Sequence, residues 1–199
     1  LVHLKGLNLK ELTIPKSAQT DLGLKHYLAA IEPRSVLYLR GWGGVPDAGL
    51  VHLKGLTNLQ TLELRGTNIT DAGLVHLKGL KNLQELRLEG TQVTDAGLVH
   101  LAGMNLKWLA IPEKARTNIG LKHYLAAVEP PTVLQLGRWE ITDAGLVHLK
   151  GMTGLQQLLL HGTKVTDTGL VHLKGLTGLQ MLDLPGETTD AGLVHLEGL

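Results

Sequence analysis

The sequence contains no cysteine. Disulfide bonds, thiolate catalysis and zinc–thiolate sites are therefore excluded. No apolar run approaches the roughly 18 residues that a transmembrane helix needs, so we predict no membrane-spanning segment. The formal net charge is only +1 over 199 residues, which removes the main electrostatic reason to expect a nucleic-acid partner.

Groups that carry nucleophilic catalysis are also scarce. The only serines are Ser17 and Ser35, and neither lies in a nucleophile elbow. The zinc-protease pattern H-E-x-x-H is absent as well. We therefore expect a protein that is not an enzyme and needs no cofactor. The chain begins without Met and inside a repeated pattern, so we interpret it as a piece of a longer protein and predict no compartment.

A repeat of about 24 residues runs through the whole chain. The glycine of a recurring "GL" pair marks it, with spacings of 23 to 26 residues, at Gly23, Gly49, Gly73, Gly97, Gly120, Gly145, Gly169 and Gly192. A fixed period in this range indicates a solenoid. With 43% hydrophobic residues, the sequence predicts one domain, 1–199, of about eight repeats.

A second, longer period is superimposed on the first. Residues 9–33 return in closely similar form as residues 106–130, a shift of 97 residues. The shift equals four repeats, so the sequence predicts an internal duplication of four-repeat blocks, about 1–97 and 98–199. In each block the first two repeats are irregular and the last two are regular.

Each regular repeat contains two patterns. In residues 59–69, "LQTLELRGTNI", the alternation of Leu62 and Leu64 predicts a short strand with one face inward. Residues 70–80, "TDAGLVHLKGL", predict a short helix that Thr70 or Asp71 caps, with Leu74 and Leu77 facing inward. Asp71, Asp95 and Asp143 recur with this pattern, so we interpret them as helix caps rather than catalytic acids.

These frames resemble the leucine-rich repeat family. The pattern is L-x-x-L-x-L-x-x-T-x-I or V, with Thr67, Thr91 and Thr163 where the family often has Asn or Cys. The "TDAGL" helix starts resemble the Thr-rich bacterial members. The resemblance implies an α/β solenoid, a horseshoe with a parallel sheet on its concave face and short helices on its convex face, that serves as a general binding scaffold.

The spacing of the elements also predicts this curvature. Parallel strands stack about 4.8 Å apart, whereas helices need about 10 Å. Strands must therefore line the concave face, and their outward side chains form a surface that is free to vary between repeats. This surface mixes aromatic, charged, amide and apolar residues, and Trp, Tyr and Arg are enriched in protein interfaces.

We therefore expect a non-enzymatic module that recognises a protein or peptide through the concave sheet face. The expected partner-binding residues are Tyr38, Arg40, Glu63, Arg65, Arg87, Glu89, Trp108, Gln135, Leu159 and His161. Trp108 occupies an outward strand position, so we predict that it is exposed. Glu63 and Glu85 would bring two carboxylates close together, but Arg65 and Arg87 beside them favour a cross-strand ion-pair network over acid–base chemistry.

Trp42 and Trp139 replace the small threonine that follows the strand in a regular repeat. Two interpretations are open. Either each indole fills a gap beside the longer helix of its block, or each is a rim anchor for a ligand. The second would also suit a carbohydrate-binding protein, which is one alternative function. Another is a structural scaffold that self-associates through the leucine-rich segments 1–7 and 193–199.

Nine histidines recur at one helix position: His3, His26, His52, His76, His100, His123, His148, His172 and His195. Neighbouring helices lie about 10 Å apart, whereas zinc needs nitrogens about 2 Å away, so we predict surface histidines and no metal site. Protonation of the row near pH 6 would place like charges side by side. The Gly-rich segment 40–50 has the strand-to-helix context of a phosphate loop without its spacing, so we interpret it as a loop insertion.

Overall fold

The computed structural model describes residues 2–32, 34–197 and 199. Leu1, Pro33 and Gly198 lie outside the described residues, so segments 1–7 and 193–199 are described only in part. The chain forms two compact units. The first consists of the residues up to 115 with 126–128, and the second of residues 116–125 with 129–199.

Each unit contains a parallel sheet whose strands follow one another in chain order. The strands of the first unit are β1 (Val36–Tyr38), β2 (Thr61–Glu63), β3 (Glu85–Arg87) and β4 (Trp108–Ala110). Those of the second are β5 (Val133–Gln135), β6 (Gln157–Leu159) and β7 (Met181–Asp183). In each strand the central leucine is in register with the central leucine of its neighbour.

The first repeat departs from the expected pattern. Its segment 11–13 has no regular secondary structure and belongs to neither sheet. Two isolated parallel bridges hold the chain on either side of it, Leu9↔Ile31 and Thr20↔Gly44. The segment between these two bridges therefore contributes no strand to the sheet of the first unit.

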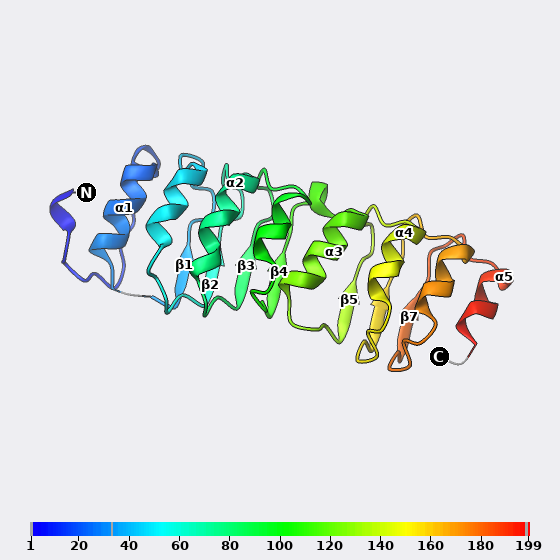
Figure 1. Cartoon of the computed structure of the whole chain (residues 1–199). Coiled ribbons are helices and arrows are strands. Elements are labelled where there is room, and N and C mark those ends of the chain that lie inside the picture. The colour runs from blue at the N-terminus through cyan, green and yellow to red at the C-terminus, as the bar shows by residue number, and fades with distance from the viewer. Residues whose placement is uncertain (1, 33, 198) are drawn as a thin grey trace. The chain divides into compact units, whose positions relative to one another are not determined.

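Helical segments lie on one side of the strands in each unit (Figure 1). The α-helices are α1 (Asp21–Ala30), α2 (Asp71–Leu74), α3 (Asn118–Ala127), α4 (Asp143–Leu146) and α5 (Asp190–Leu193). The 3₁₀ helices are η1 (Val2–Leu4), η2 (Lys16–Ala18), η3 (Asp47–Leu53), η4 (Val75–Gly79), η5 (Gly97–Leu101), η6 (Glu113–Ala115), η7 (Val147–Leu149), η8 (Asp167–Leu173) and η9 (Val194–Leu196).

The spacing of inward side chains distinguishes the long helix α1 from the shorter helical segments. In regular repeats two leucines three residues apart face the core, as Leu98 and Leu101 do in η5. A 3₁₀ helix has three residues per turn, so positions i and i+3 lie directly above one another. The first repeat of the first block instead carries an i, i+3, i+4 pattern, with Leu24 and Tyr27 buried and Leu28 half-buried, and there the ten-residue helix α1 forms.

The core of a repeat is built as the sequence predicts. Leu62, Leu64, Leu74 and Leu77 are completely buried, and a fully buried side chain of this kind contributes roughly 1.5–3 kcal/mol. The threonine that follows the strand is also buried. Its hydroxyl in Thr67 donates a 2.7 Å hydrogen bond to the Leu64 carbonyl oxygen, which satisfies a backbone acceptor inside the turn.

Neighbouring repeats are joined by an aspartate of one repeat and a threonine of the next. The Asp71 carboxylate accepts hydrogen bonds from the Thr94 backbone N–H and hydroxyl, both 2.7 Å long. The same arrangement joins Asp47 to Thr70, Asp143 to Thr166 and Asp167 to Thr189, and Asn118 to Thr142 through its amide.

The residues that cap the helices therefore differ in part from those expected from the sequence. Thr70 caps α2, because its hydroxyl accepts a hydrogen bond from the Ala72 N–H at 3.3 Å. The expectation that Asp71 and Asp143 cap their own helices is wrong, because both carboxylates are engaged by the threonine of the following repeat. In the Thr70-Asp71 pair, the threonine caps its own helix and bonds to the preceding repeat, whereas the aspartate bonds to the following repeat.

Candidate functional site

Two large aromatic side chains stand exposed on the outward face of the first unit's sheet. Tyr38, on β1, is 67% exposed and Trp108, on β4, is 59% exposed. The exposure predicted for Trp108 is confirmed. Because β1 and β4 are the outermost strands of this sheet, the two aromatic residues flank the strands β2 and β3 from opposite sides.

An ion-pair network occupies the two strands between these aromatic residues. Arg65 Nη2 lies 2.9 Å from Glu89 Oε1, and Arg87 Nη2 lies 2.6 Å from Glu85 Oε1. The hydrogen bond and the charge of Glu85 raise the pKa of Arg87 above its ordinary value. The structure thus contains the cross-strand network that the sequence predicts, and it holds both guanidinium groups in defined positions.

Glu63 lies at the centre of this network rather than on its surface. Its carboxylate is 3.7 Å from Arg65 Nε and 3.9 Å from Arg87 Nε, and the side chain is only about 9% exposed. It also accepts a hydrogen bond from the Arg65 backbone N–H at 3.3 Å. The expectation that Glu63 meets a partner directly therefore needs correction, because two arginines cover it and it instead positions them.

The other predicted residues lie at the margin of this surface or in the second unit. Arg40 is exposed just after β1, and Arg65, Arg87 and Glu89 are half-buried. The remaining three lie along the second unit's sheet, with Gln135 and His161 exposed and Leu159 half-buried. The structure thus brings seven of the ten predicted residues onto or beside one sheet, β1–β4.

The second unit's sheet carries a histidine–aspartate pair. His161 Nδ1 lies 2.7 Å from Asp183 Oδ2, with the two side chains 52% and 43% exposed. The imidazole lies across Gly137, where it occupies the space that a Cβ would need. The sequence-based site omitted Asp183, together with Glu85 of the first unit and the exposed Met181. Their outward strand positions were the signal that would have included them.

Trp42 and Trp139 are buried, each with only 8% of its surface exposed. Each packs edge-on against the tyrosine of the long helix beside it, Tyr27 at 5.3 Å and Tyr124 at 5.7 Å between ring centroids. The same burial raises the pKa of Tyr124. The gap-filling interpretation therefore fits the structure. The rim-anchor interpretation is corrected, because neither indole presents a face to a ligand.

The Gly-rich segment 40–50 also has a packing role. Gly44 forms a parallel bridge with Thr20 and lies so close to the Gln19 carbonyl that a side chain would not fit. Gly41 adopts a φ of 72°, in the left-handed region that favours glycine. These contacts account for two of the glycines without a phosphate ligand.

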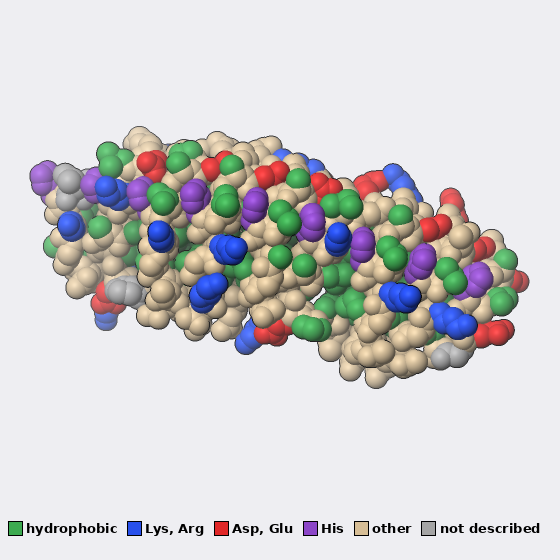
Figure 2. All heavy atoms as spheres, viewed as in Figure 1, with side chains coloured by type: hydrophobic (Ala, Val, Ile, Leu, Met, Phe, Trp, Pro, Cys, Tyr) green, Lys and Arg blue, Asp and Glu red, His purple; other side chains and the backbone are tan. Residues whose placement is uncertain are grey.

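Histidines follow one another along the helix side of each unit (Figure 2). One of them, His148, has a lowered pKa because burial, Lys122 and His123 all disfavour its charged form. Within residues 2–32, 34–197 and 199, no three His, Asp or Glu side chains gather as metal ligands would. No helix in the described part of the chain combines the length and apolar character needed to cross a bilayer.

The geometry of the repeats and a sequence match point to one family. Residues 57–100, which include β2, β3 and the helices that follow them, match the family model for leucine-rich repeats in two copies. Residues 57–100 form two leucine-rich repeats. The same strand, turn and helix recur beyond the matched segment in both units. Leucine-rich repeats commonly serve as protein-interaction modules, since stacked repeats expose an extended surface.

No curated protein matches the sequence. Several solved structures are similar to this chain. In the Rad7–Elc1 complex of yeast, the match has 19% identity and a TM-score of 0.49, and covers 87% of this chain and 49% of that chain. The match to internalin C2 from Listeria monocytogenes has 20% identity and a TM-score of 0.42, with coverages of 88% and 93%.

A third similar structure is the octameric complex of latrophilin 3, Unc5D and the leucine-rich repeats of FLRT2. It has 15% identity and a TM-score of 0.44, and the match covers 98% of this chain and 78% of that chain. The chain thus spans about half the length of its match in the yeast complex and most of the other two.

Proposed function

We propose that this leucine-rich repeat protein binds a protein or peptide on the outward face of the β1–β4 sheet, without catalysing a reaction. The single observation that carries the proposal is the exposure of Tyr38 and Trp108 on opposite sides of a fixed ion-pair network. Trp, Tyr and Arg are the residue types enriched at the energetic centres of protein interfaces.

The size of the surface suits a peptide that lies across the strands. Tyr38 and Trp108 are separated by three strand spacings across the sheet and two residues along it, or roughly 16 Å. An extended peptide covers this distance with about four or five residues. We therefore expect a partner with two apolar side chains, one against each aromatic residue, and a polar stretch between them that meets Arg65 and Arg87.

The charge of the surface favours specificity over long-range attraction. Arg65 and Arg87 face three carboxylates, those of Glu63, Glu85 and Glu89, and the exposed Arg40 adds a third positive charge nearby. The surface is therefore almost neutral overall. Apolar burial on the two aromatic residues would supply most of the affinity, while the fixed guanidinium groups select the partner's polar atoms.

The test compares capture of partners by three versions of the purified chain. One is unchanged, one carries Trp108→Ala with Arg87→Ala, and one carries Val75→Ala with Lys78→Ala on the helix side of the same unit. Each is immobilised and exposed to an extract of the source organism. A partner is accepted only if the first and third proteins capture it and the second does not. Its binding is then measured with purified components.

Two results decide the proposal. A loss of affinity of more than about tenfold in the sheet variant, with an unchanged far-ultraviolet circular dichroism spectrum, supports it. If the variant with Trp108→Ala and Arg87→Ala captures the partners as well as the unchanged chain does, the binding surface lies elsewhere.

Self-association is a second candidate function. Large apolar side chains are exposed in the repeats nearest to both chain ends, with Leu7 53%, Leu193 46% and Val194 59% exposed. Apolar surface of this kind favours stacking against another chain. Light scattering between about 10 and 500 μM tests this function, because stacking raises the mean mass with concentration. A constant mass over that range would contradict it.

A further inference from the structure

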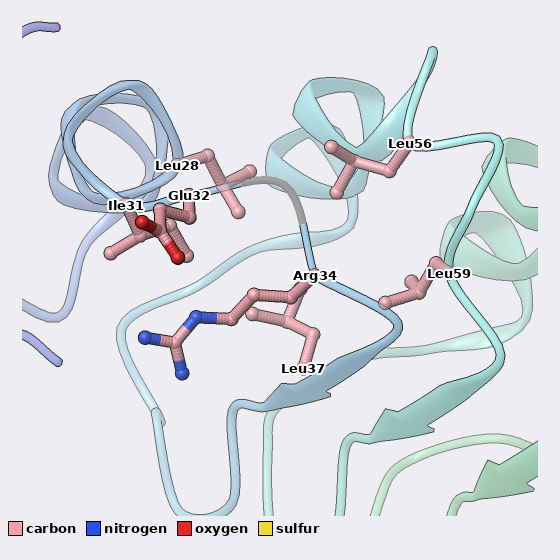
Figure 3. A pocket seen from close by; sticks show the side chains of 7 residues that line it. All are labelled: Leu28, Ile31, Glu32, Arg34, Leu37, Leu56 and Leu59. Carbon is pink, nitrogen blue, oxygen red and sulfur yellow. The ribbon is translucent and has the colours of Figure 1, made fainter. Parts of the chain in front are cut away.

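A small apolar cavity lies in the first unit, below the end of α1 (Figure 3). Its volume is about 90 Å³. The aliphatic lining comes from both neighbouring repeats and consists of Leu28, Ile31, Leu37, Leu56 and Leu59. Glu32 and Arg34 complete the wall. The cavity is separate from the sheet surface proposed above, so the test of one site does not depend on the result for the other.

The size and lining of the cavity select an aliphatic group. A water molecule occupies about 30 Å³ in the liquid, so the cavity corresponds to roughly three waters. Leucine and isoleucine side chains offer such waters no hydrogen bonds, and cavities of this kind bind apolar molecules instead. A branched chain of about four carbons, such as an isobutyl group, fits this volume.

Arg34 adds a charged group to the same wall. Its Nη2 nitrogen is buried and has no hydrogen-bond partner among the described residues. In Figure 3 the aliphatic part of Arg34 borders the cavity, and its guanidinium group extends toward the side of Ile31 and Glu32. No ion pair joins Arg34 to Glu32 within the part of the chain that is described. A buried, unsatisfied guanidinium nitrogen is costly, and a carboxylate is the group that matches its geometry best.

We propose that this cavity binds a branched aliphatic carboxylate, with the branched chain among the leucines and the carboxylate on Arg34. Two sources share this chemistry, namely a free branched-chain acid or amino acid and the C-terminal leucine of a peptide. Glu32, which is exposed beside Arg34, suits the ammonium group of a free amino acid. A ligand of eight or nine heavy atoms is expected to bind with a dissociation constant on the order of 1 mM.

The second unit contains a natural comparison. A pocket beside the corresponding turn of the second unit is lined by Pro130, Pro131, Thr132 and residues 151–155, and its volume is about 340 Å³. Pro131 stands there at the position of Arg34. This larger cavity therefore has no guanidinium group in its lining, and the proposal predicts that it does not select a carboxylate.

The experiment is a titration of the isotopically labelled chain followed by ¹H–¹⁵N correlation spectra. The probes are 4-methylpentanoate, L-leucine, the peptide Gly-Gly-Leu and, as an uncharged control, 4-methylpentanamide. We expect 4-methylpentanoate to cause saturable shifts of the Leu37 and Leu59 amide signals. We expect 4-methylpentanamide to bind at least about tenfold more weakly. The Met152 and Leu155 signals of the second unit serve as an internal control and stay in place. Comparison of L-leucine with Gly-Gly-Leu distinguishes the two sources.

Two variants test whether Arg34 itself binds the carboxylate or whether any positive charge in the unit has the same effect. Arg34→Gln is expected to weaken 4-methylpentanoate binding at least tenfold, whereas Lys78→Gln, which removes one positive charge elsewhere in the same unit, leaves it unchanged. The proposal is overturned if no saturable shift occurs below about 20 mM acid, about twenty times the expected dissociation constant. Equal affinity for the acid and the amide overturns it too, and this comparison uses the unchanged chain, so it holds even if Arg34→Gln fails to fold.

Discussion

The carboxylate of Asp71 fills the space in which a Cβ on Gly97 would lie. Asp71 is held there by its two hydrogen bonds to Thr94, so it cannot move aside without breaking them. The same contact recurs between Asp143 and Gly169. Thr, Asp and Gly therefore recur together in this leucine-rich repeat because they form one joint between adjacent repeats.

Replacement of Gly97 by alanine is expected to destabilise the first unit. The added methyl group displaces the Asp71 carboxylate, and overpacking of this kind costs roughly 1–3 kcal/mol. The matched control is Gly79→Ala. Gly79 lies in η4 with open space around its α-carbon, so this change is expected to be neutral or to stabilise by about 0.4–1 kcal/mol.

Urea unfolding curves of the two variants and the unchanged chain give the free energies of unfolding. The combined change Asp71→Ala with Gly97→Ala completes the test. Once the carboxylate is gone, the alanine at position 97 has room, so the double variant is expected to lose less stability than the sum of its single changes. Strict additivity would show that the two residues do not compete for the same space.

Asp167 makes the stability of the second unit depend on pH in the acid range. The side-chain and backbone hydrogen bonds from Thr189 lower the pKa of Asp167 below its ordinary value of 3.8. Because the folded-state pKa lies below the unfolded one, ionised Asp167 stabilises the fold fully above the ordinary value. This contribution is lost as the pH falls through the lowered pKa.

Asp167→Asn removes this titration while it keeps a side chain that can bond to threonine, as Asn118 does with Thr142. The variant is expected to melt below the unchanged chain at pH 7, and the difference is expected to shrink as the pH falls below about 4. Melting temperatures between pH 2.5 and 7 check this. Asp190→Asn is the control, because the described residues give that exposed carboxylate no hydrogen bond. A difference that stays constant down to the lowest pH would contradict the linkage.

The sequence was sufficient to predict the repeat and its core. The alternation of Leu62 with Leu64 and the threonine at position 67 are local patterns, and each is imposed by one strand and one turn. The Asp71–Thr94 joint was misinterpreted as a cap, because it links side chains 23 residues apart. Only the stacking of two repeats brings those side chains together.

The candidate surface was partly predictable for the same reason. Strand alternation correctly placed Trp108 outward, but it also placed Glu63 outward, where two arginines bury it. The alternation of residues along a strand predicts the direction in which a side chain points. It does not predict whether long neighbouring side chains cover it. Trp42 could not be assigned either, because its burial depends on Tyr27 of the preceding repeat.

His148 is expected to weaken the second unit on mild acidification. Burial, Lys122 and His123 lower the pKa of His148 below its ordinary value of 6.5. The neutral imidazole is therefore favoured by the fold, and stability is lost as the pH falls below 6.5 toward the lowered pKa. We expect a lower melting temperature at pH 5 than at pH 7.5, and a smaller decrease in His148→Gln. Equal melting temperatures at the two pH values would refute the effect of the histidine row.

Arg138 occupies a backbone conformation that suits glycine. Its φ is 63°, and the corresponding residue of the first unit is Gly41 with a φ of 72°. The order of the two residues is exchanged because His161 lies across Gly137 and leaves no room for a side chain there. Arg138→Gly is therefore expected to stabilise the second unit by about 1 kcal/mol, and Gly41→Ala to destabilise the first by about as much. Denaturant unfolding measures both, and a loss of stability in Arg138→Gly would show that its side-chain contacts outweigh the strain.

Trp42 and Trp108 are expected to respond in opposite ways to truncation. Trp42 is buried against Tyr27, so Trp42→Ala leaves a cavity and is expected to cost about 3–5 kcal/mol. Trp108 is 59% exposed, so Trp108→Ala is expected to change stability by no more than about 0.5 kcal/mol. It should also remove most of the fluorescence that acrylamide quenches, because Trp42 and Trp139 are shielded from the solvent. If quenching is undiminished in Trp108→Ala, a second indole is exposed to solvent. The proposed partner surface would then have to include that second tryptophan.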